Sequence, residues 1–121
     1  MMMVRRGERG AVTAELAMAL PLLVAVTVGL VWLLAIGAAQ LRVVDGARET
    51  ARAVARGDDE GSAVGQGRRV APEGAAFTVT EAGHEVHVRV VARPDGPGGI
   101  FHFLPSVQLE AEAVTTAEDP P

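Results

Sequence analysis

The side chains that could carry out chemistry are few and widely spaced in this sequence. There is no cysteine, which excludes a thiol nucleophile and a cysteine-based metal site. Neither Ser62 nor Ser106 has a histidine base with an orienting acid at a recognisable spacing. His84 and His87 would fall on opposite sides of a strand or in its turn, and His102 stands among apolar residues. We therefore expect no catalytic residues and no metal site, and a protein that is not an enzyme.

Two polar stretches resemble ligand-binding loops only in their composition. Residues 58–61, Asp-Asp-Glu-Gly, lack the spaced oxygen ligands and the closing glutamate of a calcium loop. Residues 65–69, Gly-Gln-Gly-Arg-Arg, have neither the length nor the Gly-Lys-Ser/Thr ending of a phosphate loop. We expect a solvated linker, then a short irregular helix or loop before Pro72, and we expect no cofactor and no small-molecule substrate.

Glu15 stands at the head of the longest apolar segment of the chain. Residues 16–41 contain no charged side chain, and Arg42 ends the run. A helix that rises about 1.5 Å per residue would be roughly 39 Å long here, more than the hydrocarbon core of a bilayer requires. The rest of the chain is too small to cover a helix of this length on all sides. The segment therefore predicts a transmembrane helix.

Two features inside this run bear on its shape and contacts. Pro21 lacks the amide that would bond to the carbonyl of Ala17, so a local kink is expected. Ala25 and Gly29 form a small-xxx-small pair, which would let another helix approach closely. Such pairs also occur by chance in alanine-rich sequences, so helix packing at Ala25 and Gly29 is one of two interpretations.

The charges are distributed unevenly along the chain. The formal net charge is -4, and the residues after position 41 carry eight arginines against thirteen acidic residues. An acidic domain argues against a nucleic-acid partner, whose phosphates require a basic face. Arginines both precede and follow the apolar run, so the positive-inside rule does not decide its orientation.

The N-terminus has an order of residues that resembles a type IV prepilin processing site. Residues 1–10, MMMVRRGERG, form a short basic leader that ends in Gly10, and four residues then precede Glu15 and the apolar helix. The closest resemblance is to the TadE-like family of minor pilins and pseudopilins of tight-adherence pilus systems. Glu15-Leu16-Ala17, the later Pro21 and residues 47–52 match that family's pattern, although members often have an aromatic residue where Leu16 stands.

The resemblance implies a function in assembly. It implies cleavage by a prepilin peptidase between Gly10 and Ala11, and a role for Glu15 in pairing with a neighbouring subunit's new terminal amine and setting the register of assembly. The implied partners are the membrane, the prepilin peptidase, other pilin-like subunits and pilus assembly proteins. The implied location is the bacterial cytoplasmic membrane, in a single pass with the N-terminus cytoplasmic and the C-terminal domain extracytoplasmic, with incorporation in a pilus as a further option.

Two alternatives stay open. The chain could be an ordinary bitopic membrane adaptor that is not processed. It could also be a secreted binding domain released after Ala39, because residues 35–40 offer the small residues that a signal peptidase accepts. The apolar run is far longer than the usual core of a signal peptide, which favours the anchored forms.

Beyond the span the helical pattern continues to Arg56, and Gly57 is a plausible C-terminal cap. Arg48, Arg52 and Arg56 recur every fourth residue, as a solvated face or as a contact to lipid headgroups or another subunit. Alternation with period 2 then predicts three strands, at residues 76–80, 85–92 and 107–115. The first two strands are expected to form a hairpin with its turn at Ala82-Gly83.

These patterns predict an α+β protein in which a long N-terminal transmembrane helix extends into a small domain with a roughly three-stranded antiparallel sheet. One face of the sheet would cover the extended helix. Residues 93–99 are rich in proline and glycine and predict a loop, and residues 100–105 form an apolar patch that plugs the core or meets a partner. The predicted divisions are a basic leader (residues 1–10), the transmembrane helix (11–41), its extension (42–57), a linker with a short helix or loop (58–75), the sheet (76–116) and a tail (117–121).

Overall fold

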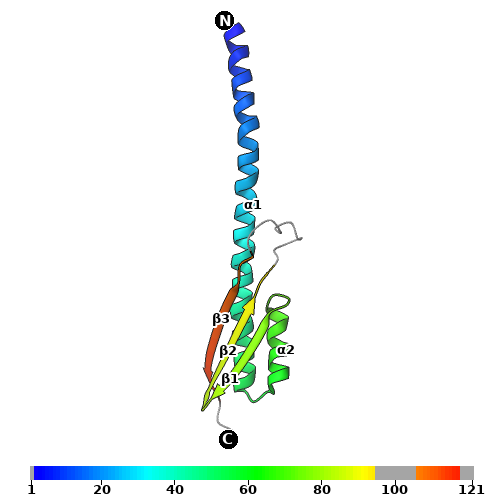
Figure 1. The fold of residues 1–121 in the computed structure, drawn as a ribbon, viewed down its shortest axis with the longest axis vertical. Helices are drawn as coiled ribbons and strands as arrows, with labels where there is room; N and C mark the ends of the chain where they lie inside the picture. The colour runs from blue at the N-terminus through cyan, green and yellow to red at the C-terminus, as the bar shows by residue number, and fades with distance from the viewer. Residues whose placement is uncertain (1, 95–105, 118–121) are drawn as a thin grey trace. The chain divides into compact units, whose positions relative to one another are not determined.

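The protein has the α+β architecture that its sequence predicts (Figure 1). The computed structural model describes residues 2–94 and 106–117, with side chains from Gly7 onward. The predicted apolar patch and most of the predicted loop before it lie outside the described residues. The chain divides into two compact units, which we call unit 1 (Met1–Leu34) and unit 2 (Ala35–Pro121). The helices are α1 (Met2–Ala55) and α2 (Glu60–Val70), and the strands are β1 (Ala76–Ala82), β2 (Glu85–Ala92) and β3 (Leu109–Thr116).

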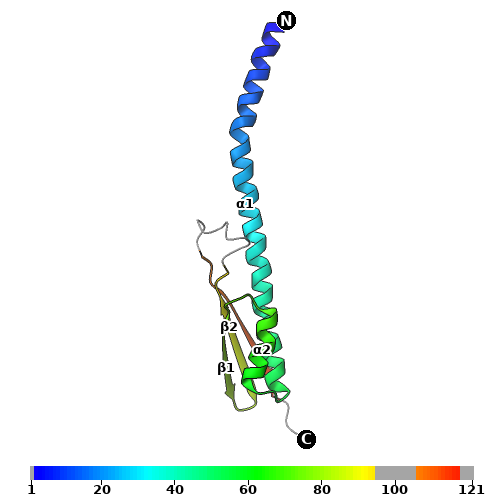
Figure 2. The same ribbon diagram turned by 90° about the vertical axis from the view of Figure 1, so that its right-hand side faces the viewer.

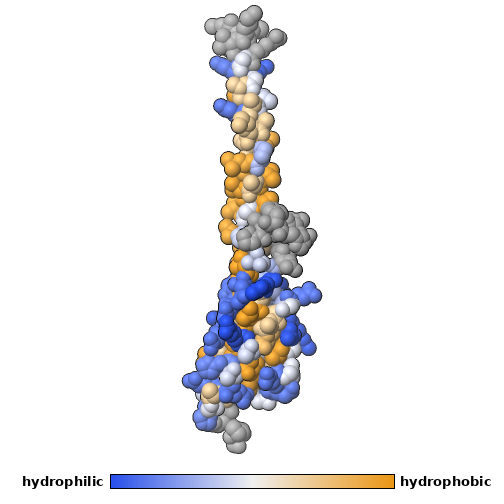
Figure 3. All heavy atoms as spheres, viewed as in Figure 1, coloured by the Kyte–Doolittle hydropathy of each residue, from blue (hydrophilic) through white to orange (hydrophobic). Residues whose placement is uncertain are grey.

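Unit 1 consists of the first part of α1, and its apolar side chains are exposed. Leu16, Met18, Leu22 and Leu34 are each more than half exposed, although such side chains are favoured in an apolar environment. Figure 3 shows hydrophobic residues over much of this part of the helix on the face in view, with hydrophilic residues near its N-terminal end. Among the described residues, Gly7–Ala55 is the one helix whose length and composition would suffice to cross a membrane. The helix continues through Pro21 without a break.

The second part of α1 belongs to unit 2 and ends in a glycine cap. Gly57 has φ 99°, a left-handed conformation that favours glycine. The Asp58 amide donates to the carbonyl of Ala53 at 3.0 Å, and the Gly57 amide donates to that of Val54 at 3.0 Å. These are the two hydrogen bonds of a Schellman motif, so the cap predicted at Gly57 is confirmed.

The segment after this cap, for which we predicted a solvated linker and then a short irregular helix or loop, is helical over most of its length. Residues Glu60–Val70 form a regular helix, α2, and Oδ2 of Asp59 accepts a hydrogen bond from the amide of Ser62 at 3.0 Å. Asp59 is therefore a helix N-cap, and Glu60 lies in the first turn, where a negative charge is favourable. The glycines of this segment weaken its intrinsic helix propensity, and burial of Ala63 and Gly67 compensates for that weakness.

The three strands form one antiparallel sheet in the order β1-β2-β3. Phe77 pairs with Val90 across β1 and β2, and Val88 pairs with Ala113 across β2 and β3. Compared with our prediction, β1 runs two residues further, to Ala82, and β3 begins two residues later, at Leu109. The hairpin turn is consequently Gly83-His84 instead of Ala82-Gly83, and Gly83 has φ 62°.

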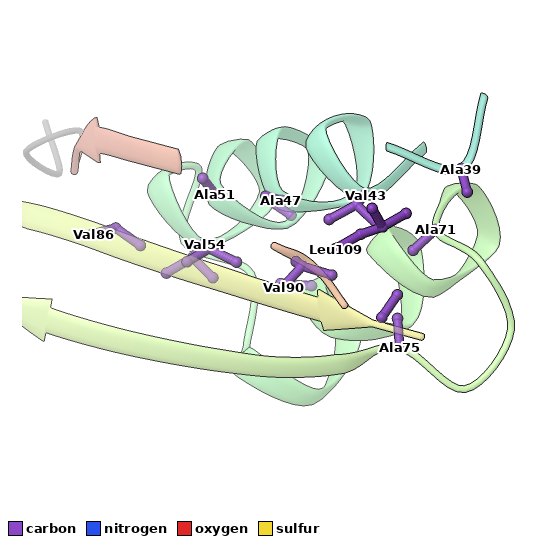
Figure 4. Close-up of a cluster of buried hydrophobic side chains, with 14 residues drawn as sticks. Ala39, Val43, Ala47, Ala51, Val54, Ala71, Ala75, Val86, Val90 and Leu109 are labelled. Atoms are coloured by element: carbon purple, nitrogen blue, oxygen red, sulfur yellow. The ribbon is translucent and has the colours of Figure 1, made fainter. Parts of the chain in front are cut away.

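The core of unit 2 lies between the sheet and the two helices, as two layers (Figure 2). Every second residue of β2 is buried, as expected for a sheet with one covered face. Figure 4 shows Val86 and Val90 of β2 directed toward the side chains of α1. Most of the residues in this core are small, which allows close packing of the backbones; they are Ala39, Val43, Ala47, Ala51, Ala53, Val54, Ala63, Ala71, Ala75, Val86, Val88, Val90, Ala92 and Leu109.

Candidate functional site

The residues of the predicted processing site lie on one continuous stretch of α1. Gly10, Ala11 and Glu15 are all exposed. A β-carbon at position 10 would have no heavy atom within 4 Å, so Gly10 has no packing role within the described structure. Glu15 makes no hydrogen bond or ion pair with the residues described here. The structure therefore leaves these residues accessible, and their predicted roles concern other molecules.

The predicted helix-packing pair is also open. Ala25 is exposed and Gly29 is partly exposed. A β-carbon added at Gly29 would meet nothing within 4 Å. Since the two residues are four apart on one helix, they lie on the same face. This face has no neighbour in the described part of the chain that would explain its small side chains.

Where the apolar run ends, polar side chains fasten α1 to the rest of unit 2. Arg42 donates from Nε to the carbonyl of Val70 at 3.1 Å and from Nη2 to the carbonyl of Ala71 at 3.2 Å. These carbonyls are at the C-terminal end of α2, where the helix dipole favours a cation. Gln40 donates from Nε2 to the carbonyl of Glu110 in β3 at 3.3 Å. The sequence marked Arg42 as the end of the span, but its contact with α2 is a tertiary feature.

The predicted basic stripe on α1 divides in the structure. Arg48 and Arg52 are exposed and make no ion pair with the described residues. Arg56 instead pairs with Asp58 at 3.6 Å, and its Nη2 donates to Oε1 of Gln66 at 3.4 Å. Arg56 therefore helps to hold α2 beside the end of α1, and only Arg48 and Arg52 remain as a solvated cationic face.

The outer face of the sheet carries a cluster that sequence reasoning did not find. Nδ1 of His87 lies 3.2 Å from Oε1 of Glu112, and its Nε2 lies 3.1 Å from Oε2 of Glu85. Hydrogen bonds to Glu112 and then to Glu85 raise the pKa of His87 above its ordinary value of 6.5. Period-2 alternation could have placed Glu85 and His87 on one face, but Glu112 comes from β3 and depends on the register of the sheet.

Other sequence candidates are not brought together. His84 lies in the hairpin turn, Ser62 is in the first turn of α2, and His102 is outside the described residues. No group of three or more histidine, aspartate or glutamate side chains within residues 2–94 and 106–117 could hold a metal ion. The part of the chain that carries functional predictions is therefore the long helix and its exit into unit 2.

The protein combines a long hydrophobic N-terminal helix with a small α+β unit into which that helix continues. This architecture is consistent with the class of pilin-like components. A family model described as TadE-like protein matches residues 10–52, so this segment of the chain is similar to the TadE-like family. The resemblance predicted from the leader is thus confirmed. The match includes Gly10, Glu15 and Gly29 and ends before α2. No curated protein and no solved structure matches the chain.

Proposed function

We propose that the protein is a membrane-anchored, pilin-like structural component of a tight-adherence-type pilus or a related secretion apparatus. The observation that carries this proposal is the coincidence of two features on one helix. The TadE-like match begins at Gly10, and the same helix exposes large apolar side chains from Leu16 to Leu34, over most of the run that follows Glu15. An exposed helix of this kind is stable in a bilayer or against other apolar helices.

In this proposal the mechanism is assembly and no reaction is catalysed. A prepilin peptidase removes residues 1–10, and the mature chain begins at Ala11. The open face at Ala25 and Gly29 then allows a neighbouring helix to approach closely. Glu15, a carboxylate at the edge of an apolar run, gains a partner in the terminal amine of a neighbouring subunit, which offsets the cost of burying its charge.

The remaining parts of the proposal follow from this anchoring. The helix spans the bacterial cytoplasmic membrane once, with the N-terminus on the cytoplasmic side and unit 2 on the outer side. The partners are the prepilin peptidase, other pilin-like subunits and pilus assembly proteins, and unit 2 presents the surface that they contact. The acidic charge of the residues after position 41 argues against a nucleic-acid partner.

An unprocessed bitopic adaptor is compatible with the same fold, but release of a secreted domain after Ala39 is disfavoured. Ala39 is buried in the core of unit 2, and Ile36 packs against that core. Unit 2 itself begins at Ala35. A cut after Ala39 would therefore sever a helix inside the unit it is supposed to release, and it would expose apolar surface that the fold covers.

N-terminal sequencing of the protein extracted from the membranes of its own cells separates these functions. Our proposal expects a chain that begins at Ala11. A chain that begins at Met1 would indicate the unprocessed adaptor, and one that begins at Gln40 and appears in the soluble fraction would indicate the secreted domain. Co-purification with pilin-like subunits after mild cross-linking tests the assembly role in the same sample.

A further inference from the structure

Four arginines gather at the end of unit 2 where the chain leaves the apolar run. Arg42 follows the run directly, and its contacts with α2 place the C-terminal end of that helix at the same level. Arg68 and Arg69 occupy the last turn of α2. Arg93 directly follows β2, whose last residue, Ala92, pairs with Leu109 at the start of β3. The next residue of β3, Glu110, accepts the hydrogen bond from Gln40, so Arg93 lies at the same end of unit 2.

None of these four arginines forms an ion pair with a carboxylate in the described part of the chain. Arg42 donates only to main-chain carbonyls. Arg68 donates from Nη1 to the carbonyl of Ala75 at 2.9 Å, and its guanidinium lies 5.2 Å from the ring centroid of Phe77. These partners are neutral, so they fix the position of the guanidinium groups without compensating their charge.

The other two arginines are similar. Arg93 donates from Nη2 to the amide oxygen of Gln108 at 2.8 Å. Arg69 is exposed and has no hydrogen-bond or ion-pair partner among the described residues. The acidic residues near this end offer little compensation, because Glu110 already pairs with Arg89, and Asp45 and Glu73 form no ion pair within the described structure.

The start of α2 and the β1–β2 hairpin lie together at the opposite end of unit 2 (Figure 1), where several acidic side chains are exposed. The exposed acidic residues at that end are Asp59, Glu60, Glu81 and Glu85. The charges of the unit are therefore unevenly distributed: four arginines without carboxylate partners lie where the apolar run ends, and at the far end these four carboxylates outnumber the exposed cations Arg52 and Arg56. Such an arrangement lowers the energy of the unit when its cationic end faces a negative surface.

We propose that the cluster of Arg42, Arg68, Arg69 and Arg93 binds the phosphate groups of anionic lipids in the leaflet where the span ends. This inference rests on the membrane anchoring in the proposed function but not on leader processing. The apolar run, at roughly 39 Å, exceeds the hydrocarbon core of about 30 Å. Arg42 consequently lies at or within about 10 Å of the lipid headgroups, and each guanidinium keeps N–H groups free for phosphate oxygens.

The sole tryptophan of the chain, Trp32, allows this to be tested in the unlabelled full-length protein. Trp32 is ten residues before Arg42, about 15 Å along a helix, and it is about 35 Å from the leader arginine Arg9. Energy transfer from Trp32 to dansyl-labelled phosphatidylglycerol or phosphatidylcholine in reconstituted vesicles reports which lipid lies beside this end of the span. We expect a several-fold preference for phosphatidylglycerol at low salt, since each arginine near an anionic surface contributes up to about fivefold.

Matched variants assign this preference to the cluster. Arg69→Gln combined with Arg93→Gln removes two exposed charges and leaves the contacts of Arg42 intact, so the preference is expected to fall severalfold, toward one. A variant that combines Arg69→Lys with Arg93→Lys keeps both charges and is expected to retain most of the preference for phosphatidylglycerol. Arg52→Gln removes an exposed cation about 15 Å further along α1, beyond the screening length of about 8 Å at physiological salt, and should change nothing.

The possible results separate the two proposals. Strong but equal energy transfer to both lipids would show that the helix is inserted in the bilayer. It would also show that the arginine cluster does not prefer anionic lipids, which contradicts this inference. A preference that persists in the Arg69→Gln and Arg93→Gln variant would also overturn it, because other charges would then be responsible. Cross-linking of the cluster to an acidic subunit without any lipid preference would assign the surface to a protein instead. Absence of transfer to either lipid would overturn the membrane anchoring itself, and this inference with it.

Discussion

Gly67 of α2 lies so close to the hydroxyl oxygen of Thr50 in α1 that a β-carbon cannot be placed at position 67 without displacing it. The same β-carbon would lie 2.8 Å from Cε2 of Phe77 and 2.9 Å from the carbonyl oxygen of Gly46. Thr50 is fully buried, and its hydroxyl donates to the carbonyl of Gly46 at 2.9 Å. The contact between α1 and α2 therefore depends on two glycines and one satisfied hydroxyl, with no large side chain between the backbones.

The first prediction is that Gly67→Ala destabilises unit 2 although alanine is the better helix former. Overpacking of this kind is expected to lower the free energy of unfolding by about 1–3 kcal/mol. The measurement is the urea dependence of amide exchange in β2, on detergent-solubilised protein. Gly65→Ala is the matched control in the same helix, because a β-carbon there meets nothing within 4 Å. It should raise stability by up to about 1 kcal/mol, and equal effects of the two changes would contradict the proposed close contact.

The second prediction concerns pH and His87, whose side chain is 34% exposed between Glu85 and Glu112. The folded state raises the pKa of His87 above 6.5, so its stabilising contribution is complete below that pH while the carboxylates are ionised. The contribution is lost as the pH rises through the folded-state pKa. The stability difference between the parent and His87→Gln should therefore be larger at pH 6 than at pH 8.5.

An NMR titration of the His87 ring checks the cause of this pH dependence. Glu112→Gln removes the largest contribution to the raised pKa, so the titration midpoint should move down toward 6.5. Glu85→Gln should lower it by a smaller amount. A midpoint that does not respond to either substitution would rule out the two carboxylates as the cause.

The third prediction is that Gly10→Val blocks cleavage of the leader, because a prepilin-type peptidase must approach the backbone closely at the cut. The fold should not change, since a β-carbon at position 10 has open space around it. Immunoblots of membranes should show a longer precursor for this variant. Gly7→Val places the same side chain elsewhere in the leader, also in open space, and should be cut normally. If parent and Gly10→Val both begin at Met1, the proposed processing is wrong.

The fourth prediction is that Glu15→Ala spares membrane insertion and leader cleavage but reduces cross-linking to pilus partners and piliation. Removal of a charge makes the span more apolar, so retention in the membrane should be unaffected. Glu15→Gln keeps the size and should behave like the alanine variant if charge pairing matters. Glu8→Ala is the control, because Glu8 lies in the segment that the proposed processing would remove. Normal assembly of both Glu15 variants would reduce Glu15 to a marker of the span boundary.

Local patterns predicted the elements whose signals are contained within a few neighbouring residues. The uncharged run from residue 16 to 41 predicted the apolar part of α1, and Gly57 predicted its C-terminal end, because the cap requires a left-handed residue. Alternation placed β2 at its observed bounds, since every second residue of the strand is buried. The leader and the residues up to position 52 also carried the TadE-like resemblance, which a family match over residues 10–52 confirms.

Whether the segment of α2 forms a helix or a loop was left open by the sequence because its local signals conflict. Asp59 and Glu60 are typical of a helix start, but Gly61, Gly65 and Gly67 lower the intrinsic propensity of the segment. The helix is stabilised by packing on α1, and at position 67 a glycine is what that packing requires. A residue that argues against a helix in isolation is thus necessary for the helix in its tertiary context.

The sequence by itself determined the apolar helix, the similarity to the TadE-like family and the strands of the sheet. It also supplied the residues at which processing and assembly are predicted. Each of these depends on periodicity or on order along the chain. Only the tertiary structure decided which charges meet. The pairing of His87 with Glu112 follows from the register of β2 and β3, and the contact of Arg42 with the end of α2 joins residues 28 and 29 positions apart. Such contacts arise from how elements pack, and no local pattern encodes the distance between two residues on different elements.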